Sequence, residues 1–390
     1  MIETLADTTA AQDWAADLRA YFRRQPVVLA VLAVLAVIFF LAVTGLSRAY
    51  QAQREALGNR WFSRGMADLN AQRFDGAVME FRSALLYSRD NYLYQLNLAE
   101  ALIGLKRTSE ASTYLVNLWD RQPEDGLVNL SLARIAVQRG QTDQALRYYH
   151  NAIYSAWPSD QEVKRRDARL ELIEFMLAAN AKAQAQSELI ALEENVGEDP
   201  SVQQRVGDLF LRVPDYEHAL AAHQLSMKGE GDNRGALAGA GWAAFQLGRY
   251  PLAERYLQAA VKANPSDARS AGLLNTTETV LRLDPFQRKI SVAQRDRIVV
   301  EDFATAGERL KSCGVARGVS LPSASQSSLS ENWARLKPTI NLGDLRRDPD
   351  LVESAMNLVF EIERQTSSTC GTPSGADLAL LLIARLHEGN

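Results

Sequence analysis

Small and large residues recur along this chain at a fixed distance, and that distance predicts its fold. Six alanines follow one another at spacings of 34, 34, 40, 34 and 34 residues: Ala77, Ala111, Ala145, Ala185, Ala219 and Ala253. A large side chain stands four residues after each alanine, and a small residue stands twelve residues before it in five of the six cases. This period, with small residues where helices cross, predicts an all-α solenoid of helix-turn-helix repeats.

Further positions agree with this interpretation and resemble a known repeat. Pro123 and Pro265 stand twelve residues after two of the alanines, where one helix must end before the next begins. Together with Trp61, these positions resemble the tetratricopeptide repeat over roughly residues 58–268. The resemblance implies six repeats with a role in protein binding. Ordinary amphipathic helices whose alanines coincide remain the alternative.

The step between Ala145 and Ala185 contains six extra residues and the chain-breaking run Trp157-Pro158-Ser159-Asp160. We expect a surface loop or an extra helical turn there, because surface connections tolerate added length. A neutral insertion is favoured over a functional one.

The family resemblance also implies a binding surface. In tetratricopeptide families the first helix of each repeat lines a concave groove that holds a partner peptide or helix. Carried over to this chain, the lining would include Phe62, Met66, Leu96, Glu100, Leu130, Arg134, Glu174, Asp208, Trp242 and Phe245. An apolar groove with a few charges suits an extended segment or an amphipathic helix. The alternative is that several of these side chains belong to the core between repeats.

Some members of the family grip a carboxylate terminus with two lysines, two asparagines and an arginine. The corresponding places here hold Phe62, Met66, Asn97, Leu127 and Ser131. Since only one of the five matches, a receptor of that kind is not expected.

A run of 20 residues without a charge extends from Val27 to Leu46. As a helix it reaches roughly 30 Å, the thickness of the hydrocarbon core of a bilayer. We therefore expect a transmembrane helix at residues 27–46. A cleaved secretory signal, with a weak cleavage-site resemblance at Ser47-Arg48-Ala49, is the alternative, but its apolar region would be only about 7 to 15 residues long.

The tail that precedes this run, residues 1–26, suggests how the chain is oriented. Trp14, Leu18, Tyr21 and Phe22 share one helical face, which predicts a short juxtamembrane amphipathic helix, with an unstructured tail as the alternative. The pair Arg23-Arg24 at the membrane favours a cytoplasmic amino terminus. We expect a single-pass protein of a bacterial inner membrane, with its repeats in the periplasm.

The carboxy-terminal third carries weaker signals. We expect a capping helix and one further helix in residues 269–313, a Ser- and Gly-rich linker at 314–330, and a small helical region at 331–390. Both cysteines of the chain, Cys313 and Cys370, lie here. Because an oxidising compartment such as the periplasm permits disulfides, we predict one between them, closing a loop of about 58 residues. Two buried free thiols are the alternative.

Composition and motifs point away from catalysis and from nucleic acid. A net charge of −4 leaves no basic field to hold a nucleic acid. The sequence contains no H-E-x-x-H, Gly-rich phosphate loop, nucleophile elbow or C-x-x-C pair. His218 and His223 are five residues apart and so do not share a helical face as metal ligands would. We expect no enzyme, no cofactor and no metal.

Three functions fit these expectations. The first is a non-catalytic, membrane-anchored scaffold that binds a protein partner, within a cell-envelope complex. The second is a periplasmic, chaperone-like holder of clients at a translocation site. The third is an envelope enzyme or glycan-handling factor that uses the carboxy-terminal domain.

Overall fold

The computed structural model describes residues 7–155, 157, 161–194, 196–197, 199–229, 233–316 and 324–387. The regular elements in these ranges are helices, with no strand among them, which confirms the all-α expectation. The chain divides into two compact units, Met1–Ala168 and Arg169–Asn390.

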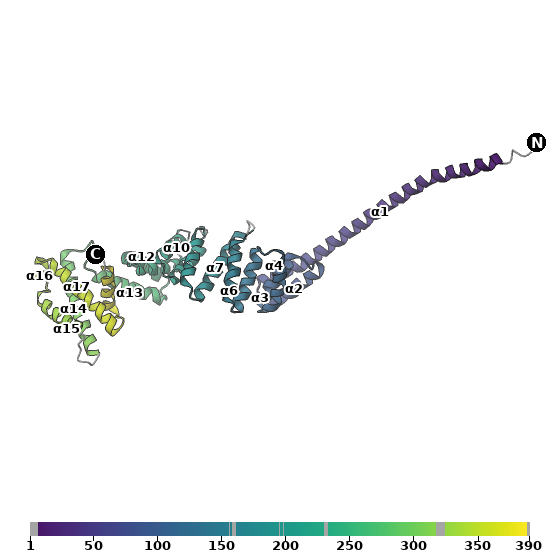
Figure 1. The fold of residues 1–390 in the computed structure, drawn as a ribbon. Coiled ribbons are helices and arrows are strands. Elements are labelled where there is room, and N and C mark those ends of the chain that lie inside the picture. Colours follow the sequence, from purple (N-terminus) through teal and green to yellow (C-terminus); the bar gives the residue numbers. More distant parts are fainter. Residues whose placement is uncertain are drawn as a thin grey trace, which may run out of the picture. The chain divides into compact units, whose positions relative to one another are not determined.

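The first unit contains three helical hairpins, each packed on the next (Figure 1). They are formed by the end of α1 (Asp7–Asn70) with α2 (Phe74–Tyr87), by α3 (Tyr92–Gly104) with α4 (Thr108–Arg121), and by α5 (Gly126–Gln138) with α6 (Thr142–Tyr154). Each hairpin corresponds to one predicted repeat.

Three further hairpins begin with α7 (Glu162–Ala178), which runs across the division between the units. Its partner in the hairpin is α8 (Lys182–Glu193). The next two hairpins are α9 (Pro200–Arg212) with α10 (Tyr216–Gly229) and α11 (Arg234–Gln246) with α12 (Tyr250–Ala263), and α13 (Ala268–Leu283) follows them. At 17 residues α7 is about one turn longer than the 13-residue helices α3, α5, α9 and α11. Part of the six-residue insertion is therefore an extra helical turn.

The alanine period has a direct packing cause. All six alanines are fully buried in the second helix of their hairpin. Where the residue twelve positions before the alanine is glycine, it faces the large residue four positions after the alanine: a Cβ on Gly65 would lie 2.6 Å from the Phe81 ring, and one on Gly241 would lie 2.7 Å from Leu257. Because interiors are close-packed, this small-to-large pairing sets how near the two helices of a hairpin approach.

A second ladder, which we did not anticipate, begins the first helices. Asn or Asp caps the amino end of α3, α5, α9, α11 and α13 by accepting backbone N–H groups, at Asn91, Asp125, Asp199, Asn233 and Asp267. Each cap stands fourteen residues after a ladder alanine. Caps of this kind contribute on the order of 1 kcal/mol each to helix stability. The remaining place in the series, Ser159, lies outside the described residues.

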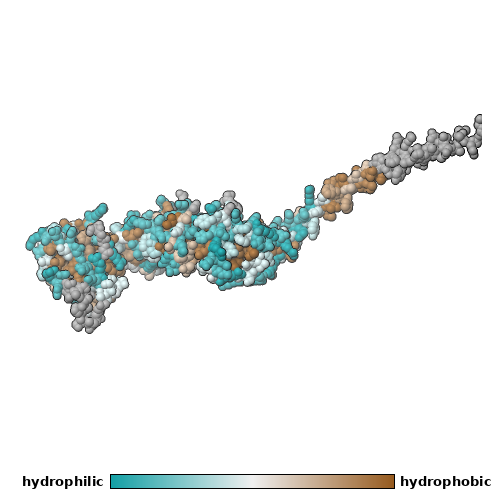
Figure 2. Space-filling view, viewed as in Figure 1, coloured by the Kyte–Doolittle hydropathy of each residue, from teal (hydrophilic) through white to brown (hydrophobic). Residues whose placement is uncertain are grey.

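The expected boundary between a transmembrane helix and the first repeat is absent. α1 is continuous for 64 residues and includes the apolar run, the connecting residues and the first helix of the first repeat. Residues 47–57 contain neither proline nor glycine, so nothing in them ends a helix. Large apolar side chains from Val28 to Leu46 are exposed, which gives α1 a hydrophobic surface there (Figure 2). By length and composition this helix could cross a membrane.

The carboxy-terminal helices form one core with the end of the repeats. They are α14 (Val292–Ala316), α15 (Ala324–Leu336), the 3-10 helix η2 (Lys337–Thr339), α16 (Leu342–Arg347), α17 (Asp350–Cys370) and α18 (Gly375–Leu386). α14 and α17 lie side by side (Figure 1). Val280 of α13, Val299 of α14 and Ile383 of α18 belong to the same buried cluster. The separate regions expected at 269–313 and 331–390 are therefore one body.

The linker expected at residues 314–330 needs correction. Residues 314–316 belong to α14 and residues 324–330 to α15, and residues 317–323 lie outside the described part. Leu329 is buried in the carboxy-terminal core, so this end of the Ser-rich segment is packed as part of a helix.

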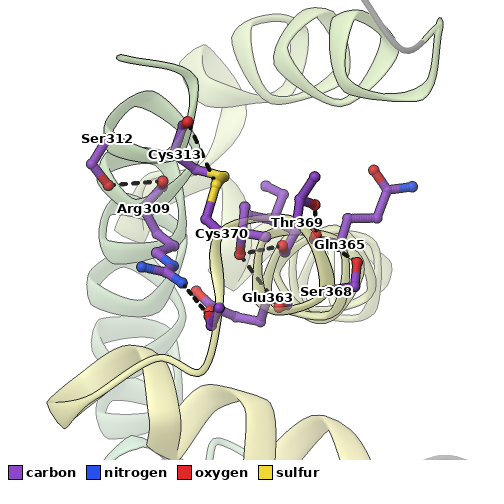
Figure 3. Close-up of a disulfide and its surroundings, with 11 residues drawn as sticks. Arg309, Ser312, Cys313, Glu363, Gln365, Ser368, Thr369 and Cys370 are labelled. Atoms are coloured by element: carbon purple, nitrogen blue, oxygen red, sulfur yellow. Dashed lines mark hydrogen bonds between the residues drawn. A yellow bond between two sulfur atoms is a disulfide. The ribbon is translucent and has the colours of Figure 1, made fainter. Parts of the chain in front are cut away.

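The two cysteines are joined. Cys313 at the end of α14 and Cys370 at the end of α17 form a disulfide, with Cα atoms 5.8 Å apart (Figure 3). Arg309 lies one turn before Cys313, and its Nη2 donates to the carbonyl of Gly371 at 3.0 Å. The ends of the two helices are thus tied by a covalent bond and a charged hydrogen bond.

Candidate functional site

The first helices α9 and α11, together with the start of the helix α13 that follows the repeats, line a groove in the second unit, here named the α9–α13 groove. Its volume is about 300 Å³. The lining comes from α9 (Asp208, Leu211), from α11 (Gly235, Ala238, Gly239, Trp242) and from the start of α13 (Asp267, Arg269, Ser270, Leu273). The groove therefore runs across the first helices α9 and α11, which is where the sequence predicts a binding surface.

The floor of the groove is formed by the small residues of α11. A Cβ on Gly239 would lie 2.2 Å from Nε2 of His223, and a Cβ on Gly207 would lie 2.8 Å from the same ring. The buried imidazole of His223 therefore fills the space between α9 and α11 beneath the groove. Because α11 has glycine here, its backbone can approach this ring closely.

An aromatic and a cationic side chain meet on the α11 and α13 walls. The guanidinium carbon of Arg269 lies 3.4 Å from the centroid of the Trp242 ring. Cation–π contacts of this kind hold a guanidinium over an indole face. The pair presents a flat, partly apolar surface that also carries a positive charge.

Two carboxylates give the groove its negative charge. Asp267 accepts the hydroxyl of Ser270 at 2.6 Å, and this bond lowers the pKa of Asp267. Partial burial raises the pKa of Asp208, which lies on α9. The groove thus combines an apolar floor with charges of both signs along its edges.

The contact between Asp208 and His223 is not an ion pair at neutral pH. Oδ1 of Asp208 lies 3.6 Å from Nε2 of His223. Burial lowers the pKa of His223 to about 4, so its imidazole is neutral near pH 7. The histidine is a packing residue under the groove.

In the second unit, two of the four expected lining residues meet in the groove. Asp208 and Trp242 line it, whereas Glu174 pairs with Arg205 of α9 at 2.8 Å. Phe245 does not line it, because its ring packs edge-on against Tyr250 at 5.5 Å and contacts the carboxy-terminal core.

The expected lining of the first unit divides between core and surface. Leu96 and Leu130 are 3% and 5% exposed, so they are core residues and offer no groove surface. Glu100 and Arg134 face each other across α3 and α5 at 3.9 Å and are partly exposed.

Phe62 and Met66 of α1 are half-buried against the core of the first unit. The Phe62 ring stacks on Tyr94 with centroids 5.1 Å apart. These two residues therefore serve mainly to pack α1 onto the next hairpin.

The α13 residues of the groove were missed, because this helix was expected only to close the solenoid. The cap ladder could have indicated Asp267, which lies fourteen residues after Ala253 as the other caps follow their alanines. In the described part of the chain, no group of three or more His, Cys, Asp or Glu side chains is placed to hold a metal ion.

Comparison with known proteins finds the same kind of repeat. Residues 69–135 and residues 235–267 each match a family model of the tetratricopeptide repeat. Among curated proteins, none matches the sequence.

Solved structures resemble parts of the chain at low identity. A structure of pilF from Pseudomonas aeruginosa is similar over 56% of this chain and 97% of its own, with 16% identity and a TM-score of 0.43. The carboxy-terminal part of a TPR repeat-containing protein from Cytophaga hutchinsonii is similar over 61% and 92%, with 12% identity and a TM-score of 0.44. YrrB, described as a TPR protein with an unusual peptide-binding site, is similar over 49% and 95%, with 13% identity and a TM-score of 0.40.

The family matches fall on the hairpins in which ladder alanines and capping residues recur with the 34-residue period. Sequence period, helix pairing and family models agree, and they show that the chain contains tetratricopeptide repeats.

Proposed function

We propose that this protein is a non-catalytic, membrane-anchored scaffold that holds an extended segment or a helix of a protein partner in the α9–α13 groove. The observation that carries the proposal is the groove itself, in which α9, α11 and α13 meet around the Trp242–Arg269 pair. Aromatic and arginine side chains dominate binding energy at protein interfaces. Asp208 and Asp267 add charges that select the partner's orientation.

An anchor in the membrane explains the amino-terminal part of α1. Apolar side chains from Val28 to Leu46 are exposed on this helix, and exposure of so much apolar surface to water is costly. A bilayer would cover them, since the segment is roughly 30 Å long.

The disulfide supports an extracytoplasmic position for the carboxy-terminal domain. Disulfides persist in oxidising compartments such as the bacterial periplasm and are rare in the cytosol. With Arg23-Arg24 at the cytoplasmic side, the repeats and the Cys313–Cys370 bridge would both be periplasmic. We place the scaffold in an assembly of the bacterial cell envelope.

Copurification from mild detergent tests the proposal. Trp242→Ala and Arg269→Ala are expected to lose one stoichiometric protein partner while keeping their helical circular dichroism. Arg255→Ala is the matched control, because Arg255 is an exposed arginine of α12 outside the groove lining.

Three other outcomes of this experiment would contradict the proposal. Retention of the partner by both groove variants would overturn the groove assignment. Recovery of many unfolded clients would indicate the chaperone-like holder, and turnover of a glycan would indicate the enzyme.

A further inference from the structure

A second hollow lies in the first unit, where α3 and α5 begin, and is named here the amino-terminal cleft. Its volume is about 560 Å³, within the usual range for ligand sites. Tyr92 and Leu93 of α3 line it, with the segment from Gln122 to Leu127 at the start of α5. Trp157 and Gln161 complete its described lining.

Trp157 forms a fixed aromatic wall of this cleft. Its Nε1 donates to the carbonyl of Ala152 at 2.7 Å, so the polar edge of the indole is already used. A Cβ on Gly126 would lie 2.5 Å from the ring, which shows that the indole rests directly on the first residue of α5. The ring is held from two sides, and it is only partly buried.

The interruption of the alanine period supplies this wall. Trp157 belongs to the insertion that lengthens one step of the ladder from 34 to 40 residues. The insertion was expected to be neutral, but it provides an aromatic side of a cleft of ligand size. The insertion therefore lies next to the starts of two first helices, α3 and α5.

The charged groups that line the cleft are acidic. Asp125 accepts the N–H of Val128 at 2.9 Å and the hydroxyl of Tyr92 at 2.7 Å, so its carboxylate is fixed in place. Burial and the neighbouring Asp125 raise the pKa of Tyr92, which therefore stays a neutral donor. Glu124 beside it is exposed.

The described lining residues include no lysine, arginine or histidine. The amino end of α5 contributes a partial positive charge of about one half, which the capping carboxylate of Asp125 offsets. The carboxylate of Glu124 is exposed and does not cap the helix, so it can attract a cation.

We infer that the amino-terminal cleft binds an arginine or lysine side chain of an extended protein segment. The cation would lie between the indole face of Trp157 and the carboxylate of Glu124, which combines a cation–π contact with charge attraction. Leu93 is 50% exposed at the rim and offers an apolar contact to a neighbouring residue of the same segment. That contact favours a peptide over a small free cation.

This inference rests on the proposed role in binding protein segments, but it concerns a different unit and different residues. The two can fail separately. Trp242→Ala should abolish partner copurification and leave binding at the amino-terminal cleft unchanged.

The test uses the full chain in mild detergent and positional-scanning mixtures of random hexapeptides on a solid support. Arginine and lysine should be enriched at one position of the bound peptides. The best basic peptide should bind at least about fivefold more weakly to Glu124→Gln and to Trp157→Leu. Asp120→Asn is the matched control, since it removes an exposed carboxylate of α4 outside the cleft.

Replacing the basic residue by citrulline, which keeps its shape without its charge, should also abolish the preference. No binding to any hexapeptide, no basic enrichment, or equal binding by wild type and Glu124→Gln would overturn the inference. Arginine methyl ester binding as tightly as the peptide would also contradict it, because the site would then be one for a small cation.

Discussion

Mild acid should destabilise the second unit through one buried histidine. The side chain of His223 has no exposed surface and lies between Gly207 of α9 and Gly239 of α11. In the described residues, neither ring nitrogen has a hydrogen-bond partner. Burial lowers the pKa of His223 to about 4, whereas an exposed histidine titrates near 6.5.

The sign and size of the effect follow from proton linkage. Between about pH 6.5 and pH 4, the unfolded chain binds a proton at His223 that the folded chain does not, so the free energy of unfolding falls as pH falls. From pH 7 to pH 5 the loss is about 2 kcal/mol, and below pH 4 it levels off at roughly 3 kcal/mol. An ionised Asp208 at 3.6 Å would reduce this loss, because it favours a protonated imidazole.

Hydrogen exchange of the α9 and α11 amides at pH 7 and pH 5 measures this loss. His223→Leu is the informative variant, because leucine occupies the same place in three other repeats, at Leu115, Leu189 and Leu257. Wild type should lose about 2 kcal/mol more than this variant on acidification.

His218 provides a control of opposite sign. The hydrogen bond to Asp215 raises the pKa of His218, so this histidine adds stability below pH 6.5 that is lost as pH rises. His218→Gln should therefore steepen the loss in acid. Equal pH slopes for wild type and His223→Leu, or a His223 titration midpoint near 6.5 by NMR, would refute the reasoning.

Three further predictions concern packing and the carboxy-terminal core. Gly239→Ala should destabilise the second unit by about 1 to 3 kcal/mol in urea unfolding, because its Cβ would overlap the His223 ring. Gly272→Ala, whose Cβ meets nothing within 4 Å, should instead stabilise by up to about 1 kcal/mol, and equal effects would contradict this. Replacing both cysteines of the disulfide by alanine should cost about 4 kcal/mol, since 57 positions separate them; an unchanged melting temperature would count against it. Burial raises the pKa of Glu363 to about 8, so stability should fall as pH rises from 4.5 to 8; Glu363→Gln should flatten this profile, and an unaltered profile would disprove the burial effect.

The sequence predicted the repeats well because their packing is local. A small residue packs against a large one at a fixed sequence separation within a hairpin, as Gly65 does with Phe81. The period of the fold is therefore visible as a period in the sequence. The capping ladder has the same property, and it could have been found in the same way.

Groove residues were harder to predict, because a first helix carries apolar residues toward both the core and the groove. Leu96 and Trp242 occupy comparable helices, but Leu96 is buried and Trp242 lines the groove. Arg269 lies on α13, outside the alanine ladder, so no period indicated its contact with Trp242. Pairing of this kind depends on how neighbouring hairpins stack.

Composition was a poor guide to the Ser- and Gly-rich segment and to the carboxy-terminal core. The segment at 314–330 is rich in serine and glycine, but its second half is helical and buries Leu329 in the carboxy-terminal core. The carboxy-terminal core likewise joins helices far apart in sequence, and no short-range pattern records that contact.

Site-specific photocrosslinking in native membranes tests most directly whether the α9–α13 groove holds a protein partner. A photoreactive residue at Leu273, which lines the groove, should give one discrete protein adduct. The same residue at Leu225, which is exposed on α10 and does not line the groove, should give none. No adduct from Leu273, or the same adducts from both positions, would contradict the account.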